Sequence, residues 1–153
     1  MYLKNYHKAV ESVIGKPNDT QEYYKLFEEF KLNTAKVAAF KAHDATNVLK
    51  ILYKSDPEKF EENSKIIEKT YTRYQAAEYN TTTARCRSAV QFEQFAKEKD
   101  LYPNIEWLPT SSSTPRELHA SFVGLVLPQD DPFWQNNQPG NLYNCKCDWR
   151  TSD

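Results

Sequence analysis

Apolar side chains along the first hundred residues recur at intervals of three and four, which is the spacing of one face of an amphipathic helix. The longest such series is Tyr23, Leu26, Phe27, Phe30, Thr34, Val37 and Ala38. Interruptions are few, because Gly15, Pro17 and Pro57 are the only glycine and prolines in residues 2–100. The pattern therefore predicts two or three long helices that pack as antiparallel neighbours.

These interruptions set the expected helix boundaries. A first, short helix ends at Gly15. Asn18 or Asp19 then offers a side-chain oxygen that can cap a second helix, which runs on to the residues just before Pro57. Each of these boundaries rests on a residue type that favours the end of a helix rather than its interior.

A third helix is expected from Pro57, which suits a first helical turn, to about Lys99. Its apolar face carries Phe60, Ile67, Tyr71 and Tyr74. Residues 81–83 are three consecutive threonines, and their β-branched side chains lower helix propensity. We therefore expect a kink or a break in the third helix at this point.

The pattern changes after Pro103. Residues 104–108 alternate polar and apolar side chains, which predicts a short strand. Residues 110–114 form a polar loop, and residues 121–127 predict a second strand that Gly interrupts. Residues 141–149 are expected to pair as a third strand. The fold class is therefore α+β, with long N-terminal helices as a hairpin or small bundle and a small irregular β-rich C-terminal motif.

Composition fits one soluble globular domain over residues 1–153, with a helical part over 1–102 and a β-rich motif over 103–153. Hydrophobic residues make up 39% and charged residues 27% of the chain, as is typical of a globular domain. No run of about 18 apolar residues occurs, which excludes a membrane-spanning helix. The net charge of −1 does not indicate a protein that binds nucleic acid mainly through phosphates, although local DNA contact by the helical part is compatible with it.

The glycines and cysteines exclude further classes. With only Gly15, Gly124 and Gly140, neither a phosphate-binding loop nor a dinucleotide fingerprint can form, so nucleotide-dependent catalysis is not expected. The three cysteines leave one unpaired in any pairing. This favours a reducing compartment over a disulfide scaffold.

The densest run of uncommon residues lies between 116 and 147. In order, these residues are Arg116, His119, Gly124, Asp130, Asp131, Pro132, Phe133, Trp134, Pro139, Gly140, Cys145 and Cys147. This order resembles the phage Mu F-like minor head protein family, also called the SPP1 gp7-type head morphogenesis domain. Two departures stand out: Ser112 and Thr114 occupy places where the family tends to carry an acidic residue and an arginine, and Lys146 replaces the arginine common between the cysteines.

The resemblance implies a minor capsid or head morphogenesis protein of a phage or prophage, found in the virion or the bacterial host cytoplasm. It implies a structural role in head assembly, with the portal or other head proteins as partners and an influence on DNA packaging or ejection. The alternative is an enzyme, either a small metal-assisted hydrolase or a toxin-like nuclease, using the His119, Cys145 and Cys147 region. That alternative requires a cleft that joins His119 to Arg116 or to a carboxylate.

His119, Cys145 and Cys147 together supply an imidazole and two thiols, which are donors that zinc favours. The candidates for a fourth ligand are Asp130, Asp131, Asp148 and Cys86. The alternative is that both cysteines lie on one face of an extended strand and pack as small hydrophobic side chains. His119 would then form a hydrogen bond with the Pro139–Gly140 turn. The sequence leaves both interpretations open.

The remaining motif residues favour structural roles. Asp130 and Asp131, directly before a proline, are more typical of a turn cap than of a catalytic pair. Phe133 and Trp134 are expected to anchor their loop onto the helices. For His119 we expect a buried, hydrogen-bonded position.

Overall fold

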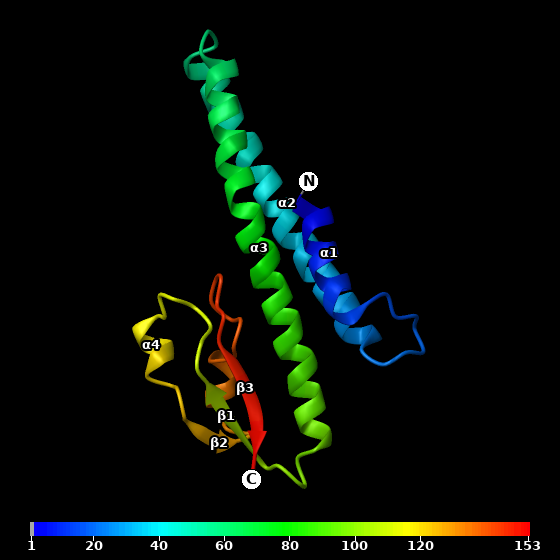
Figure 1. Cartoon of the computed structure of the whole chain (residues 1–153). Coiled ribbons are helices and arrows are strands. Elements are labelled where there is room, and N and C mark those ends of the chain that lie inside the picture. The colour runs from blue at the N-terminus through cyan, green and yellow to red at the C-terminus, as the bar shows by residue number, and fades with distance from the viewer. Residues whose placement is uncertain (1) are drawn as a thin grey trace.

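The computed structural model describes residues 2–153, and its longest elements are three helices. These are α1 (Tyr2–Ile14), α2 (Tyr24–Ser55) and α3 (Phe60–Lys97). Helices α2 and α3 run antiparallel as a long hairpin, and α1 lies against both of them (Figure 1). The predicted helical hairpin is therefore confirmed, and the short helix α1 packs beside it.

The helix boundaries differ from the expected ones at the start of α2. The side chain of Asn18 accepts a hydrogen bond from the backbone N–H of Thr20 at 3.1 Å, which closes a local turn instead of capping a helix. Helix α2 begins only at Tyr24, after Tyr23, whose φ of 64° lies in the left-handed region. The predicted cap at Asn18 or Asp19 is therefore wrong, because Asn18 is used within the connecting loop.

Helix α3 continues through the three threonines at 81–83, so the break that was one of the two expectations does not occur. The hydroxyl of Thr81 donates to the carbonyl oxygen of Ala77, one turn earlier, at 2.7 Å. Thr81 and Thr82 are also buried, so tertiary packing outweighs their lower helix propensity.

The C-terminal module, residues 103–153, is built on a three-stranded antiparallel sheet. Its strands β1 (Asn104–Leu108), β2 (Val126–Pro128) and β3 (Asp148–Ser152) are arranged in the order β2-β1-β3. The short helices α4 (Glu117–Ala120) and α5 (Phe133–Asn136) occupy the connections between strands. The α+β class is confirmed, and β1 lies where the alternating pattern predicted it.

The second and third strands are shorter than predicted and displaced toward the C-terminus. Residues 121–124 form turns, because Gly124 takes a φ of 81° and its N–H donates to the carbonyl oxygen of Trp107 at 2.9 Å. Residues 141–147 form a loop with a turn at Asn144, whose φ is 54°. Both cysteines of this loop therefore precede β3, and the strand predicted over 141–149 is wrong at its start.

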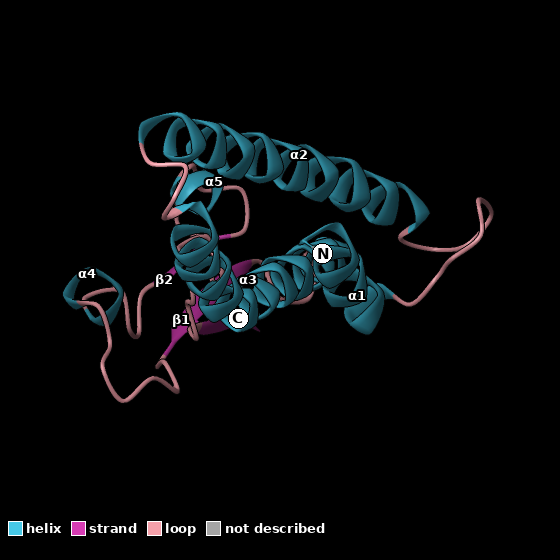
Figure 2. Cartoon of the chain, turned by 90° about the horizontal axis from the view of Figure 1, so that it is seen from above, coloured by secondary structure: helices cyan, strands magenta, loops and turns pink. Residues whose placement is uncertain are grey.

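Two clusters of buried side chains hold these parts together. One contains Val10, Phe27 and Cys86 and joins the three long helices. The other contains Ile105, Trp107, Trp134 and Trp149 and includes Phe92 and Phe95 of α3 at its edge. The sheet therefore packs on the C-terminal half of α3, and α4 lies on the side of the module away from α1 and α2 (Figures 1 and 2).

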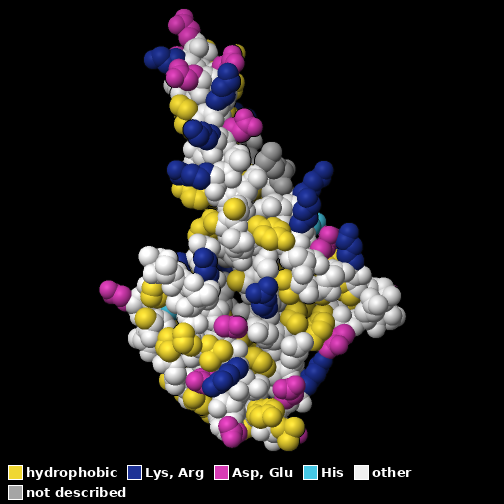
Figure 3. Space-filling view, viewed as in Figure 1, with side chains coloured by type: hydrophobic (Ala, Val, Ile, Leu, Met, Phe, Trp, Pro, Cys, Tyr) yellow, Lys and Arg dark blue, Asp and Glu magenta, His cyan; other side chains and the backbone are white. Residues whose placement is uncertain are grey.

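The end of the hairpin beyond α1, residues 45–70, is called the distal arm here. It projects from the rest of the molecule as a narrow extension on which charged and hydrophobic side chains alternate (Figure 3). Its exposed hydrophobic residues are Val48, Ile51, Tyr53 and Ile66. Within residues 2–153, none of the helices combines the length and the apolar character needed to cross a bilayer.

Candidate functional site

His119, Cys145 and Cys147 are brought together in the C-terminal module. The Nδ1 atom of His119 lies 3.5 Å from Sγ of Cys145 and 3.3 Å from Sγ of Cys147. Their possible ligand atoms all lie within 4.8 Å of one another. His119 and Cys145 are buried, and Cys147 is partly exposed. Residues that are 26 and 28 positions apart in the chain thus form one compact cluster.

Aromatic packing fixes the orientation of the His119 ring. Helix α4 carries His119, whose ring meets Trp107 of β1 edge to face, with centroids 5.4 Å apart. Phe122 stacks on the same imidazole, with centroids 6.1 Å apart. Since both neighbours are themselves part of the packed module, the imidazole is held with Nδ1 toward the thiols.

Backbone contacts set the position of the cysteines. The N–H of Asn144 donates to the hydroxyl of Thr81 on α3 at 2.8 Å, and the N–H of Cys145 donates to the carbonyl oxygen of Leu142 at 3.1 Å. On the other side, the N–H of Ser111 donates to the carbonyl oxygen of Lys146 at 3.2 Å. The loop is therefore tied both to α3 and to the segment after β1.

The electrostatic environment favours the neutral forms of His119 and Cys147. Burial lowers the pKa of His119, and the nearby Arg116 guanidinium lowers it further. Burial raises the pKa of the Cys147 thiol to about 11, and its contact with Cys145 adds to this shift. Near neutral pH the cluster thus holds a neutral imidazole that can accept a hydrogen bond from a thiol or donate an electron pair to a metal.

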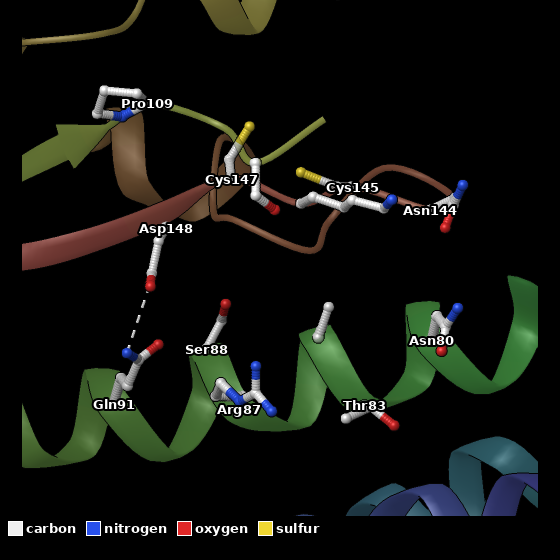
Figure 4. A pocket seen from close by; sticks show the side chains of 13 residues that line it. Asn80, Thr83, Arg87, Ser88, Gln91, Pro109, Asn144, Cys145, Cys147 and Asp148 are labelled. Carbon is white, nitrogen blue, oxygen red and sulfur yellow. Dashed lines mark hydrogen bonds between the residues drawn. The ribbon is translucent and has the colours of Figure 1, made fainter. Parts of the chain in front are cut away.

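Two clefts border the cluster. One of about 200 Å³ is lined by Arg116, His119 and both cysteines, together with residues of the 110–115 segment. The other, of about 440 Å³, lies between α3 and the loop of residues 137–147, called the C-terminal loop here. Figure 4 shows Asn80, Thr83, Arg87, Ser88 and Gln91 on the α3 side and Asn144, Cys145, Cys147 and Asp148 on the loop side. Of the two cysteines, the partly exposed Cys147 is therefore reachable by small molecules from the surface.

The acidic pair of the motif lies outside this cluster. Asp131 Oδ1 accepts a hydrogen bond from the N–H of Phe133 at 2.8 Å, in the manner of a turn cap. Asp130 forms a surface ion pair with Lys99 at 3.2 Å. Asp148, a further candidate ligand, accepts from Gln91 at 3.5 Å and from the N–H of Trp149 at 3.0 Å.

The Pro139–Gly140 turn rests on α3 rather than on His119. The Ser88 hydroxyl donates to the carbonyl oxygen of Pro139 at 2.6 Å, and Arg85 Nε donates to that of Gly140 at 3.2 Å. The sequence pattern indicated no role for Ser88 or Arg85, because two polar residues within a long helix carry no signal of a distant partner.

Trp149 and Gln129 are further residues without a predicted role. Trp149 stacks on Phe92 of α3 with centroids 5.7 Å apart, and Phe92 and Phe95 pack against the same buried cluster that contains Trp134. The buried Gln129 amide donates to the carbonyl oxygens of Phe95 at 3.0 Å and of Tyr102 at 2.7 Å, which fixes the chain where α3 ends. Trp134 is buried within the C-terminal module, and the centroids of its ring and of the Trp149 ring lie 5.7 Å apart.

Cys86 is separate from the cluster and should be chemically inert in the folded protein. It is fully buried, and burial raises its pKa to about 12. Because the thiolate is the reactive form, we expect iodoacetamide to modify Cys147 before Cys86 in the reduced, metal-free protein at mildly alkaline pH. Peptide mapping by mass spectrometry, with a urea-unfolded sample as reference, measures this order. Equal labelling of both residues in the native protein would contradict the burial of Cys86.

The fold and the cluster define a small α+β module with a projecting helical hairpin, in which a histidine and a Cys-x-Cys pair are packed side by side. The chain belongs to the Phage Mu protein F like protein family, whose model matches residues 50–150. It is similar to a protein of Escherichia phage Mu named "Putative capsid assembly protein F", with 34% identity over 87 residues, which are 57% of this chain and 20% of that protein. The chain thus spans about a fifth of that relative's length. No solved structure matches the chain.

Proposed function

We propose that this chain is a minor head protein that takes part in capsid assembly and contacts the portal through its distal arm. Membership of the Phage Mu protein F like family supports the role in head assembly. The choice of the distal arm as the contact surface rests on its form, because it is a two-helix projection with exposed hydrophobic side chains.

An apolar groove lies where the distal arm leaves α1. It has a volume of about 360 Å³ and is lined mainly by Tyr2, Ala45, Leu49, Ile67 and Tyr71. A groove between two helices can accept the apolar face of a third helix. We assign this place to a helical segment of another head protein, and the exposed Ile51 and Ile66 extend the apolar surface along the arm.

The C-terminal module supplies the rigid base for this arm. Its carbonyl groups at Pro139, Gly140 and Asn141 accept hydrogen bonds from Ser88 and Arg85 of α3, and Trp149 stacks on Phe92 of the same helix. Because α3 runs from this base into the arm, the module fixes the direction in which the arm points.

Replacing the apolar residues of the distal arm should reduce incorporation into heads. In a phage whose own gene is deleted, a Val48→Ser, Ile51→Ser and Ile66→Ser variant is supplied in trans and compared with a Lys50→Ser, Lys54→Ser and Lys69→Ser control. We expect the first variant to be at least about tenfold depleted in purified heads, since losing one apolar anchor of an interface costs about 1.4 kcal/mol or more. Quantitative mass spectrometry measures the content of heads, and circular dichroism verifies that both variants remain helical.

Equal incorporation of the apolar variant and the lysine control would overturn the assignment of the arm. The portal contact is tested separately by placing a photo-cross-linking amino acid at position 51 and identifying the product in assembled heads. A cross-link to the portal protein is expected. A cross-link only to the coat protein would keep the assembly role and contradict the portal as partner.

The site offers the hydrolase alternative the cleft at His119 that it requires. Although the smaller cleft joins Arg116 to His119, its lining within residues 2–153 includes no carboxylate. A general acid or base partner for His119 is thus missing from the place where the reaction would occur. Membership of the Phage Mu protein F like family, rather than the shape of the cleft, is what favours an assembly role.

A further inference from the structure

The His–Cys cluster has a geometry that suits a metal ion, independently of what the distal arm contacts. We propose that His119, Cys145 and Cys147 bind one zinc ion, with a water molecule from the adjoining cleft as the fourth ligand. The donors are one imidazole nitrogen and two sulfurs, a set that selects zinc among the common divalent ions.

The distances between the donor atoms agree with such a site. Zinc–sulfur bonds of about 2.3 Å and zinc–nitrogen bonds of about 2.0 Å at tetrahedral angles place nitrogen and sulfur about 3.5 Å apart. In the structure, Nδ1 of His119 lies 3.5 Å and 3.3 Å from the two sulfurs. Both nitrogen–sulfur distances therefore match those of a tetrahedral zinc site, and all three donor atoms lie within 4.8 Å of one another.

The surroundings hold these donors in place. Trp107 and Phe122 pack on the His119 ring, so Nδ1 stays directed at the sulfurs. The turn at Asn144, which is bound to Thr81 of α3, precedes the first cysteine. A single residue between two cysteines is a short spacing for zinc, and the irregular backbone before β3 is what allows both sulfurs to face one point.

The fourth ligand of the zinc ion would be a water molecule. Within residues 2–153, the only metal-type grouping of His, Cys, Asp or Glu side chains is this trio. Asp130 and Asp131 are engaged with Lys99 and with the N–H of Phe133, and Cys86 is buried in the helical core. The cleft of about 200 Å³ borders all three ligands and can admit a water molecule.

Zinc would join the two irregular halves of the C-terminal module. Binding converts both thiols into thiolates and releases two protons to solvent, so the ion and its two anionic ligands form a neutral unit. His119 comes from the connection between β1 and β2, whereas the cysteines come from the segment before β3. The ion would thus cross-link a region with little regular structure. Its fourth position, occupied by water, would stay open as in catalytic zinc sites, whereas structural zinc sites are closed by four protein ligands.

The test is metal binding by the reduced protein. Native mass spectrometry after addition of zinc should show one ion per chain in the wild type and in Cys86→Ser, which removes a cysteine outside the cluster. His119→Gln, Cys145→Ser and Cys147→Ser should each lose the stoichiometric ion. Zinc should raise the Tm of the wild type and of Cys86→Ser but not that of Cys145→Ser.

Cobalt substitution tests the ligand set in the intact protein, which removes any dependence on variants that fail to fold. Tetrahedral cobalt with two thiolates gives sulfur-to-metal charge-transfer absorption in the near ultraviolet and strong visible bands. A wild-type chain that binds no zinc or cobalt in the reduced state would overturn the proposal. The same holds if Cys86→Ser loses the ion, or if X-ray absorption of the zinc-loaded protein shows no sulfur neighbour.

Discussion

Replacing Trp149 with alanine should lower the free energy of unfolding of the C-terminal module by about 3–5 kcal/mol, the range for removing a large aromatic side chain from a core. The indole is 2% exposed and contacts Phe92, Phe95 and Trp134, each with centroids 5.7 Å away. Its Nε1 also donates to Gln91 on α3 at 3.1 Å. The substitution therefore removes both the centre of the module's core and its main aromatic contact with α3.

The loss should be local as well as large. Helices α1 to α3 keep their own core of Val10, Phe27 and Cys86, so most of the helical circular dichroism should survive in Trp149→Ala. Hydrogen exchange should instead show faster exchange at β1 and β3. Tyr102→Ala, which removes an aromatic ring that is 43% exposed, is the control and should change stability by no more than about 0.5 kcal/mol. Equal destabilisation by the two variants would contradict the assigned role of Trp149.

Periodicity predicted the helices well, because apolar residues repeat at helical spacing both where a face is buried and along the exposed distal arm. Gly15 and Pro57 stand at or near real helix ends, and the row containing Phe27, Thr34 and Ala38 is the buried face of α2. The error at residues 81–83 has a physical cause: the Thr81 hydroxyl bonds within its own helix and to the C-terminal loop, which a propensity scale does not describe.

The C-terminal module was less predictable, because its strands are held by contacts distant in the chain. Strand β1 alternates clearly and was placed correctly. Strand β2, in contrast, has only three residues and is defined by its pairing with β1. The convergence of His119 with the cysteines depends on the turn at Asn144 and on the packing of α4 against Trp107. The residue types were compatible both with a metal site and with cysteines packed on a strand face, and their spacing alone could not decide between the two.

Replacing Gly140 with alanine should detach the C-terminal loop from α3. A Cβ atom at this position would lie 2.8 Å from the backbone carbon and 3.0 Å from the carbonyl oxygen of Ala84, and 2.9 Å from the backbone nitrogen of Arg85. These are main-chain atoms of a helix and cannot move aside. Gly140 also has a φ of 83°, so alanine meets both a backbone penalty and a steric clash. We expect a loss of about 2–5 kcal/mol from these two causes together.

Gly124→Ala separates the two causes, because Gly124 has nearly the same φ, 81°, but no atom within 4 Å of the place that a Cβ would occupy. This control should lose only the backbone penalty of about 1–2 kcal/mol. Urea unfolding followed by circular dichroism and tryptophan fluorescence measures the difference between the variants. Because Arg85 and Ser88 bind the carbonyl groups at 139–141, Gly140→Ala should also speed hydrogen exchange in the cysteine loop, whereas Gly124→Ala should not. If both variants lose the same stability, the close approach of the turn to α3 is not what Gly140 provides, and the rigid base assigned to the distal arm would lack one of its supports.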